Sequence, residues 1–330
     1  MKKGTKKLKP DTVLKNYWSG NEEFADLFNA VLFGGAERIK PNELEDVDTE
    51  ESAILENKEY AESLQASRDT IKIRKKSTAF GIELVLLGIE NQGNIHYAMP
   101  MRVMGYDYHS YKKQYDDNAR KYKTSKGLTD DEYISRMKKT DKFIPVITIV
   151  VYYGEKEWDG AKTLHEMLNI PKEVEPFINN YKMLLVEARE NNLILHNVNN
   201  QDLFSLLEII LDTSTPRKEA KQRAIDYSES HKPDKSVVMT VAGAANIKLD
   251  YSSLERGGDY MCTLFQEIEE EGKVQGIAQG MATGKAQGII EMGKAYNIPE
   301  QDIIEKLQSA LNITLEQAKE YIQMFSAKTI

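Results

Sequence analysis

Cysteine is almost absent from this sequence of 330 residues, because Cys262 is the only one. An internal disulfide framework is therefore excluded. The chain also lacks any apolar run near the roughly 20 residues that cross a bilayer. Its basic N-terminus, MKKGTKKLKPD, is not followed by the apolar segment of a signal peptide. We therefore expect a cytoplasmic protein that does not enter a membrane.

Three common catalytic signatures are missing as well. The five histidines and one cysteine are spread along the chain without the spacing of zinc ligands. No glycine-rich phosphate-binding loop lies between a strand and a helix. No serine or cysteine nucleophile stands at a sharp strand-to-helix turn. Zinc, P-loop and α/β-hydrolase chemistry are therefore not indicated.

Acidic residues outnumber basic ones, 52 to 44, which gives a net charge of −8. Such an average disfavours duplex DNA, whose phosphates repel an acidic surface. The charge is uneven, however. Residues 112–142 hold ten Lys/Arg against six Asp/Glu, whereas residues 251–330 hold seven against twelve. The middle of the chain thus remains available for an anionic ligand, and a merely solvated surface is the alternative.

Hydrophobic periodicity predicts a helix and a hairpin in the first part of the chain. Apolar side chains recur at helical spacing within residues 12–33, and Gly34-Gly35 ends the pattern. The segment 43–65 is acidic and shows no strand pattern, so we expect a peripheral insertion. Strands are predicted at 69–75 and 82–90, and the polar sequence KSTAFG joins them as a hairpin.

Helices and strands then alternate. A long helix is predicted from about Met99 to Tyr122, followed by a strand at 145–153 and a weaker one at 182–188. A short amphipathic helix at 201–212 closes the pattern. Residues 1–212 therefore predict an α/β domain in which helices flank a mixed central β-sheet.

The C-terminal part predicts helices alone. Residues 213–236 are polar and contain two prolines, so they are expected to form a linker before a helical region at 237–330. Glycines at every fourth position from 272 to 288 form a stripe that lets a second helix approach closely, which favours self-association through these helices. A loosely structured linker is the alternative. NIPEQDIIEKL and NITLEQAKEYI predict a terminal helical hairpin.

The predicted hairpin places two acids opposite each other. If it is centred near Ala79 and Phe80, residues whose numbers sum to 159 lie opposite, and Asp69 and Glu90 form such a pair. Gln92 projects from the same face as Glu90. Two adjacent carboxylates repel unless one is protonated or a cation separates them, and Mg²⁺ or Mn²⁺ prefers such oxygen ligands. Solvated strand ends are the alternative, and a shift of one residue would separate the two acids.

Four motifs follow one another in a characteristic order. They are Ser67-Arg68-Asp69, then Gly88-Ile89-Glu90-Asn91-Gln92, then Met99-Pro100-Met101-Arg102 with Tyr106, and finally Tyr152-Tyr153-Gly154 with Trp158. In order and spacing they resemble the PD-(D/E)xK nuclease family of transposase-like proteins, also called recombination-promoting nucleases. The resemblance covers residues 20 to 326 and includes the glycine-rich C-terminal part.

The resemblance implies a restriction-endonuclease-like fold and an Mg²⁺- or Mn²⁺-dependent deoxyribonuclease that cleaves DNA internally. Asp69 and Glu90 would be the metal ligands. Gln92 stands where the wider superfamily has a lysine, and its amide cannot act as a general base. Its role would be to orient the attacking water or to contact the phosphate.

Other residues are candidates for supporting roles. Many enzymes of the superfamily add an acid from the first helix, and Glu22, Glu23 and Asp26 are the candidates here, with Asp26 preferred. Arg102 and Tyr106 lie one helical turn apart and are candidates for a phosphate contact. A helix-surface arginine is the alternative for Arg102.

The sequence therefore predicts hydrolysis of DNA phosphodiester bonds by metal-activated water, in transposition or DNA recombination. We expect low sequence specificity, because no helix-turn-helix or zinc-finger motif is present. Two alternatives remain. A catalytically inactive nuclease fold that serves as a binding or assembly module would explain the acidic net charge and the missing lysine. A nuclease directed at RNA is the other.

Overall fold

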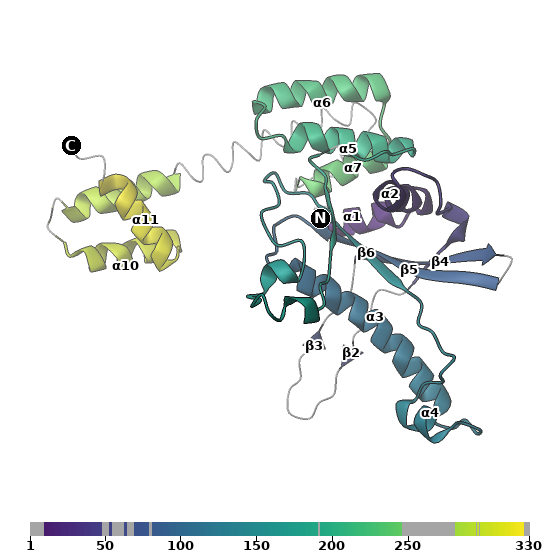
Figure 1. Cartoon of the computed structure of the whole chain (residues 1–330). Coiled ribbons are helices and arrows are strands. Elements are labelled where there is room, and N and C mark those ends of the chain that lie inside the picture. Colours follow the sequence, from purple (N-terminus) through teal and green to yellow (C-terminus); the bar gives the residue numbers. More distant parts are fainter. Residues whose placement is uncertain are drawn as a thin grey trace, which may run out of the picture. The chain divides into compact units, whose positions relative to one another are not determined.

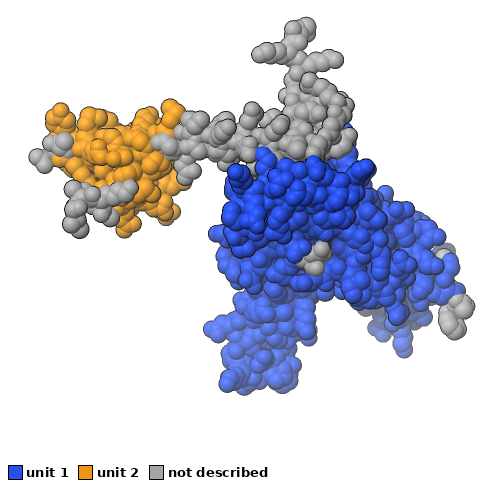
Figure 2. Space-filling view, turned by 90° about the horizontal axis from the view of Figure 1, so that it is seen from above, with its two compact units in different colours: residues 1–263 blue, residues 264–330 orange. Residues whose placement is uncertain are grey.

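The computed structural model describes residues 10–47, 53–54, 63–64, 69–78, 81–190, 192–245, 281–294, 296 and 298–326. The chain divides into two compact units, residues 1–263 and 264–330 (Figures 1 and 2). No helix among the described residues is both long enough and apolar enough to cross a membrane.

The first unit is built on a mixed sheet of five strands in the order β1-β4-β5-β6-β7. The strands are β1 (Leu44–Asp46), β4 (Thr70–Thr78), β5 (Gly81–Gln92), β6 (Val146–Tyr152) and β7 (Leu184–Glu187). Strand β4 is antiparallel to β1 and β5, whereas β5, β6 and β7 are mutually parallel. The short strands β2 (Ala53–Ile54) and β3 (Ser63–Leu64) pair separately. The predicted α/β fold with a mixed central sheet is confirmed.

Helices cover both faces of this sheet (Figure 1). Helix α3 (Met99–Tyr122) packs on one face, where Met99, Val103 and Tyr106 share a core cluster with Val150 and Tyr152 of β6. The other face is covered by helices from both ends of the unit. They are α1 (Pro10–Trp18), α2 (Asn21–Phe33), α5 (Val198–Leu211) and α7 (Lys235–Ala244), of which α7 contacts α1 and α5. The apolar run of β5 is thus explained by burial on two faces.

The prediction of a linker at residues 213–236 is wrong. Most of it forms α6 (Arg217–His231), which packs against α5, and α7 begins before its end. The first unit therefore extends past residue 212 and includes both helices, with α4 (Asp130–Ser135) as a further helix after α3.

The described residues of the second unit form helices, as predicted. Residues 281–294 form a helix, followed by α10 (Glu300–Leu311) and α11 (Leu315–Ser326). Ile290, Ile304 and Leu307 belong to its core. The glycines at 272, 276 and 280 lie outside the described residues. Around Gly284 and Gly288 a side chain would meet nothing within 4 Å, so no helix of the described chain packs on that part of the stripe.

Candidate functional site

The hairpin of β4 and β5 has the predicted register. Thr70 pairs with Ile89, and every pair down to Thr78 and Gly81 keeps the same sum. Asp69 directly precedes β4, at the end of the hairpin where Glu90 and Gln92 lie. The turn at residues 79–80 lies outside the described residues.

Glu90 is the centre of a buried polar cluster. Its side chain is 6% exposed and belongs to the sheet face that α3 covers. One oxygen, Oε1, accepts hydrogen bonds from Gln92 Nε2 at 3.0 Å, Arg102 Nη2 at 3.0 Å and Tyr106 Oη at 3.1 Å. Gln92 lies on the same strand as Glu90, whereas the packing of α3 brings Arg102 and Tyr106 to it. Four of the six predicted site residues meet here.

Arg102 and Tyr106 both donate hydrogen bonds to Glu90. The guanidinium forms an ion pair with the carboxylate, yet the Arg102 side chain stays 33% exposed. Burial raises the pKa of Tyr106 to about 12, and the negative charge of Glu90 adds to this effect. The Tyr106 hydroxyl therefore remains a hydrogen-bond donor at neutral pH. The alternative of a helix-surface arginine does not describe Arg102.

Asp69 lies at the same end of the hairpin but in a different environment. Its Oδ2 accepts a hydrogen bond of 2.7 Å from the backbone N–H of Asn91. Burial raises the pKa of Asp69, the Asn91 hydrogen bonds oppose this, and the charges of Asp11 and Lys15 act in opposite directions. Both charged residues belong to α1. Asp69 is therefore close to α1, whereas Glu90 faces α3.

Asp26 does not join this cluster. Its Oδ1 accepts a hydrogen bond from the backbone N–H of His196 at 2.8 Å, and its Oδ2 accepts one from Asn200 Nδ2 at 2.9 Å. Both partners stand at the start of α5 or just before it. Asp26 thus connects α2 to α5, and the structure brings it to neither Asp69 nor Glu90.

Sequence reasoning missed a polar chain on the opposite side of β5. Asn91 Oδ1 accepts a hydrogen bond from Tyr153 Oη at 3.0 Å, and the same hydroxyl accepts one from Trp18 Nε1 at 2.9 Å. Burial raises the pKa of Tyr153. Strand alternation could have placed Asn91 on the face opposite Glu90. Its partner Tyr153 directly follows β6, and the partner of Tyr153, Trp18, lies in α1. Both are too distant in sequence to be inferred from a local pattern.

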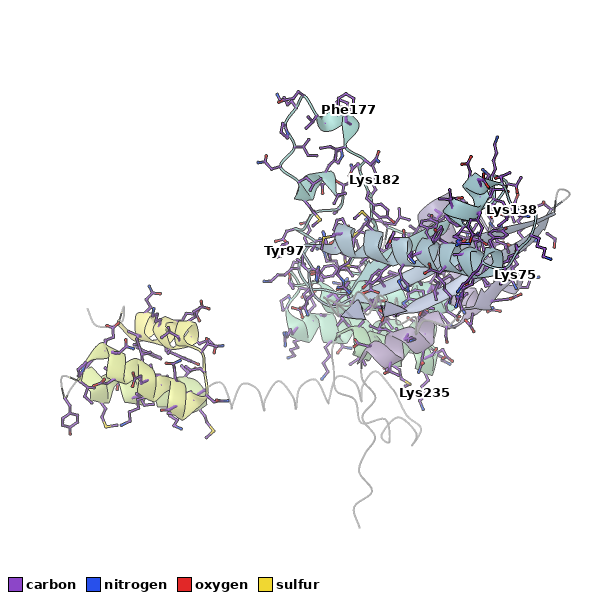
Figure 3. The ribbon with its side chains drawn as sticks, turned by 90° about the horizontal axis from the view of Figure 1, so that it is seen from below. Lys75, Tyr97, Lys138, Phe177, Lys182 and Lys235 are labelled. Carbon is purple, nitrogen blue, oxygen red and sulfur yellow. The ribbon has the colours of Figure 1, made fainter. Side chains whose placement is uncertain are left out.

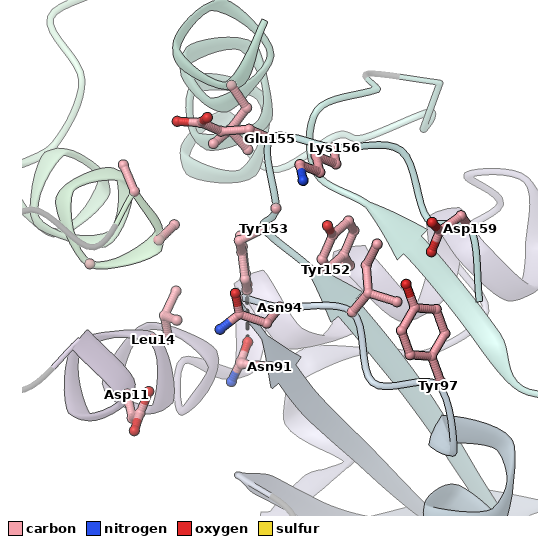
Figure 4. Close-up of a pocket in the computed structure, with 17 residues that line it drawn as sticks. Asp11, Leu14, Asn91, Asn94, Tyr97, Tyr152, Tyr153, Glu155, Lys156 and Asp159 are labelled. Carbon is pink, nitrogen blue, oxygen red and sulfur yellow. Dashed lines mark hydrogen bonds between the residues drawn. The ribbon is translucent and has the colours of Figure 1, made fainter. Parts of the chain in front are cut away.

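A cavity of about 710 Å³ opens at the carboxyl ends of β5 and β6. Figure 4 shows Asp11 and Leu14 of α1 on one side of it and Tyr97 and Asp159 on the other. Other lining residues are Asn91, Asn94, Tyr152, Tyr153, Glu155 and Lys156. Parallel sheets commonly bind ligands at this position. Because Asn91 lines the cavity and also contacts Asp69, the cavity adjoins the end of the hairpin that carries the acids.

The oxygen ligands at this end of the hairpin are of the type that a hard cation prefers. Asp69 and Glu90 supply carboxylate oxygens, and Mg²⁺ commonly uses one or two protein carboxylates together with water. A metal at Glu90 would compete with Arg102 for the same negative charge. No group of three or more His, Cys, Asp or Glu side chains suited to a metal ion occurs among the described residues. Asp69 and Glu90 therefore suit Mg²⁺ by donor type, with Glu90 facing α3 and Asp69 lying close to α1.

No protein-family model, curated protein or solved structure matches the chain.

Proposed function

We propose that this protein is a metal-dependent DNA endonuclease that hydrolyses phosphodiester bonds with low sequence specificity. The observation that carries the proposal is the register of β4 and β5, which puts Asp69 and Glu90 at one end of a buried hairpin. The cavity supports the proposal, because Asn91 both lines it and donates a hydrogen bond to Asp69, so a ligand there would adjoin this end of the hairpin. The setting in transposition or DNA recombination is part of the same proposal and rests on the resemblance alone.

Each residue of the cluster has a proposed role. Asp69 and Glu90 would hold Mg²⁺ or Mn²⁺, which when bound lowers the pKa of a water ligand and neutralises phosphate charge. Gln92 holds the Glu90 carboxylate through its amide N–H and cannot itself remove a proton. Tyr106 holds the same carboxylate. Arg102 is exposed enough to contact a substrate phosphate with the part of its guanidinium that Glu90 does not use.

A catalytically inactive binding or assembly module is the second candidate, and one observation favours it. Arg102 already neutralises Glu90, as it would in a purely structural buried ion pair. A module of this kind would keep its fold and its cavity without cleaving any nucleic acid. The two functions therefore differ in the effect of metal, which the structural ion pair does not need.

The test is cleavage of supercoiled plasmid DNA with Mg²⁺ or Mn²⁺ by the full chain and by Asp69→Asn and Glu90→Gln. These isosteric changes remove one charge each and preserve the size of the side chain. We expect cleavage to require metal and to fall by about 10²-fold or more in both variants, because a lost metal ligand removes several kcal/mol of transition-state stabilisation. Circular dichroism would show that both variants are folded.

The matched control is Glu173→Gln, which removes an exposed carboxylate from a loop that supplies none of the proposed site residues. It should cleave like the parent. Cleavage that survives in Asp69→Asn and Glu90→Gln, or no cleavage with either metal, would overturn the proposal and leave the binding module. A matched RNA substrate in the same assay separates a DNA-directed from an RNA-directed enzyme.

A further inference from the structure

The far half of α3 and the segment after it carry a charge opposite to that of the whole chain. Residues 112–142, here named the α3–α4 arm, hold ten Lys/Arg and six Asp/Glu, whereas the chain as a whole has a net charge of −8. Figure 1 shows α4 at the end of α3. In Figure 3, Tyr97, just before α3, and Lys138, on the arm, lie at opposite ends of this helix.

Only some of the arm's Lys and Arg side chains form ion pairs within the arm. Lys112 pairs with Asp116, and Arg120 pairs with Asp117. Four other lysines are exposed and have no ion pair in the part of the chain that the structure describes: Lys123, Lys126, Lys139 and Lys142. These four are therefore available to an anionic partner.

The arm holds these cations on an ordered support. Tyr122 is 3% exposed and lies between Lys121 and Lys138, whose Nζ atoms are 5.3 Å and 5.6 Å from its ring centre. Its hydroxyl donates a hydrogen bond of 3.0 Å to Asp141. Thr129 caps α4 through a reciprocal capping box. The segment beyond α3 is thus folded back onto the end of the helix, and it is not a loose cationic tail.

The arm lies well away from Glu90. One uninterrupted helix runs from Arg102, which contacts Glu90, to Tyr122, where the arm's buried aromatic ring lies. At 1.5 Å per residue these positions are separated by roughly 30 Å along the helix axis. Duplex DNA rises about 3.4 Å per base pair, so this length corresponds to about nine base pairs.

We propose that the α3–α4 arm binds the phosphate backbone of duplex DNA about one helical turn away from the bond at the Glu90 site. The inference rests on the proposed function and adds its substrate class: a duplex that extends to one side of the cleaved bond. A rigid cationic surface at a fixed distance suits a stiff polyanion, because both sites can then be engaged without bending the DNA. Phosphate contacts position the DNA without reading its sequence, in keeping with low specificity.

The experiment measures binding of the full chain to duplex DNA in EDTA, where metal-dependent cleavage cannot occur. The arm variant replaces four lysines by glutamine: K123Q/K126Q/K139Q/K142Q. The control makes the same charge change at four exposed lysines outside the arm: K172Q/K182Q/K218Q/K232Q. Fluorescence anisotropy would give Kd for a duplex of about 30 base pairs, and for one of about 8, over a range of salt concentrations.

We expect the arm variant to bind the long duplex about 10-fold or more weakly than the control. Its salt slope should become shallower by roughly 0.9 for each lysine that contacts a phosphate. The short duplex cannot reach both sites, so the control should bind it more weakly than it binds the long duplex. Equal affinity of the arm variant and the control for the long duplex would overturn the inference.

Failure of the proposed nuclease function and failure of the arm inference give different results in the cleavage and binding assays. If no variant and no parent protein cleaves plasmid DNA, but duplex binding still depends on the arm, the nuclease proposal fails and the arm stands as a DNA-binding surface. If cleavage occurs and the arm variant binds and cleaves like the control, the arm inference fails and the nuclease proposal stands.

Discussion

Glu90 is a carboxylate almost removed from water, and its neighbours offset the cost of that burial. An isolated buried charge costs several kcal/mol, so such groups are stable only when paired and hydrogen-bonded. Here a guanidinium, a phenol and an amide all donate to one carboxylate oxygen. Gln92 and Glu90 are two residues apart on one strand. Because side chains alternate between the two faces of a sheet, this spacing puts both on the face that α3 covers.

The cost of burying the Asp69 carboxylate is offset less completely, and we therefore expect its charge to lower the stability of the fold at neutral pH. Burial raises its folded-state pKa above the unfolded value of about 3.9. A group with a raised folded pKa contributes stability below the unfolded pKa, and this contribution is lost as the pH rises through the folded pKa. Ionised Asp69 therefore weakens the fold at neutral pH. Asparagine cannot ionise and still offers an oxygen to the Asn91 N–H.

We therefore expect Asp69→Asn to melt at a higher temperature than the parent protein at pH 7. The difference should shrink as the pH falls through the raised folded pKa and vanish below the unfolded pKa of about 3.9. Thermal melts followed by circular dichroism between about pH 3 and pH 8 would measure it, with Glu173→Gln as a surface control. A lower melting temperature at pH 7 would contradict the argument. A more stable protein without cleavage would mark Asp69 as a group kept for function at a cost in stability.

At the scale of elements, one buried lysine joins three parts of the first unit. Lys72 of β4 is fully buried, and its Nζ donates a hydrogen bond of 2.8 Å to the Ser19 carbonyl after α1. It also pairs with Asp46 of β1 and lies 5.6 Å from the ring centre of Phe24 in α2. The side chain fills space as well as carrying charge.

These two contributions are separable by substitution. Lys72→Ala should lower the free energy of unfolding by about 2–5 kcal/mol, because it leaves a cavity under β4. Lys72→Met should recover most of this loss, since an apolar side chain of similar volume often replaces a buried ion pair and Asp46 is already 78% exposed to water. Urea unfolding would measure both. If the methionine variant were as unstable as the alanine variant, the charge itself would be required.

The elements also show which features a sequence can reveal. The hairpin register followed from local numbering, because a short polar turn between two apolar strands leaves few pairings. Strand β1 was missed because it lies in an acidic segment and is stabilised by ion pairs with the neighbouring strand β4, such as Lys75 with Glu45. The hydrogen-bonded chain from Trp18 through Tyr153 to Asn91 could not be inferred, because the fold alone brings these three residues together.

Helix α6 was missed for a different physical reason. Only small side chains of this helix are buried, namely Ala220, Ala224 and Ser228 at intervals of four residues. A helix that packs closely through small residues shows no stripe of large apolar side chains, so its sequence looks like a polar linker. The following helix shows the reverse, because Val237, Val238 and Val241 are buried. Those valines were predicted to be helical but were assigned to the wrong domain.

At the scale of the whole molecule, the placement of α7 predicts where the chain can be divided. Helix α7 packs against α1 and α5 and belongs to the first unit, which continues to residue 263. A chain that ends at residue 236 keeps the domain expected from the sequence but loses this helix. Burial of each valine contributes about 1.5–3 kcal/mol, and the three removed valines together approach the whole stability of an ordinary domain, about 5–15 kcal/mol.

We therefore expect residues 1–263 to unfold with the same midpoint as the first unit of the full chain, and residues 1–236 to be largely unfolded or insoluble. The matched comparison is the full chain with Val237→Ala and Val241→Ala, which keeps the helix but removes part of its buried surface and should be intermediate in stability. Urea unfolding followed by circular dichroism would rank the proteins. If residues 1–236 unfolded at the same urea concentration as residues 1–263, α7 would be only an appended helix, and the boundary expected from the sequence would be the physical one.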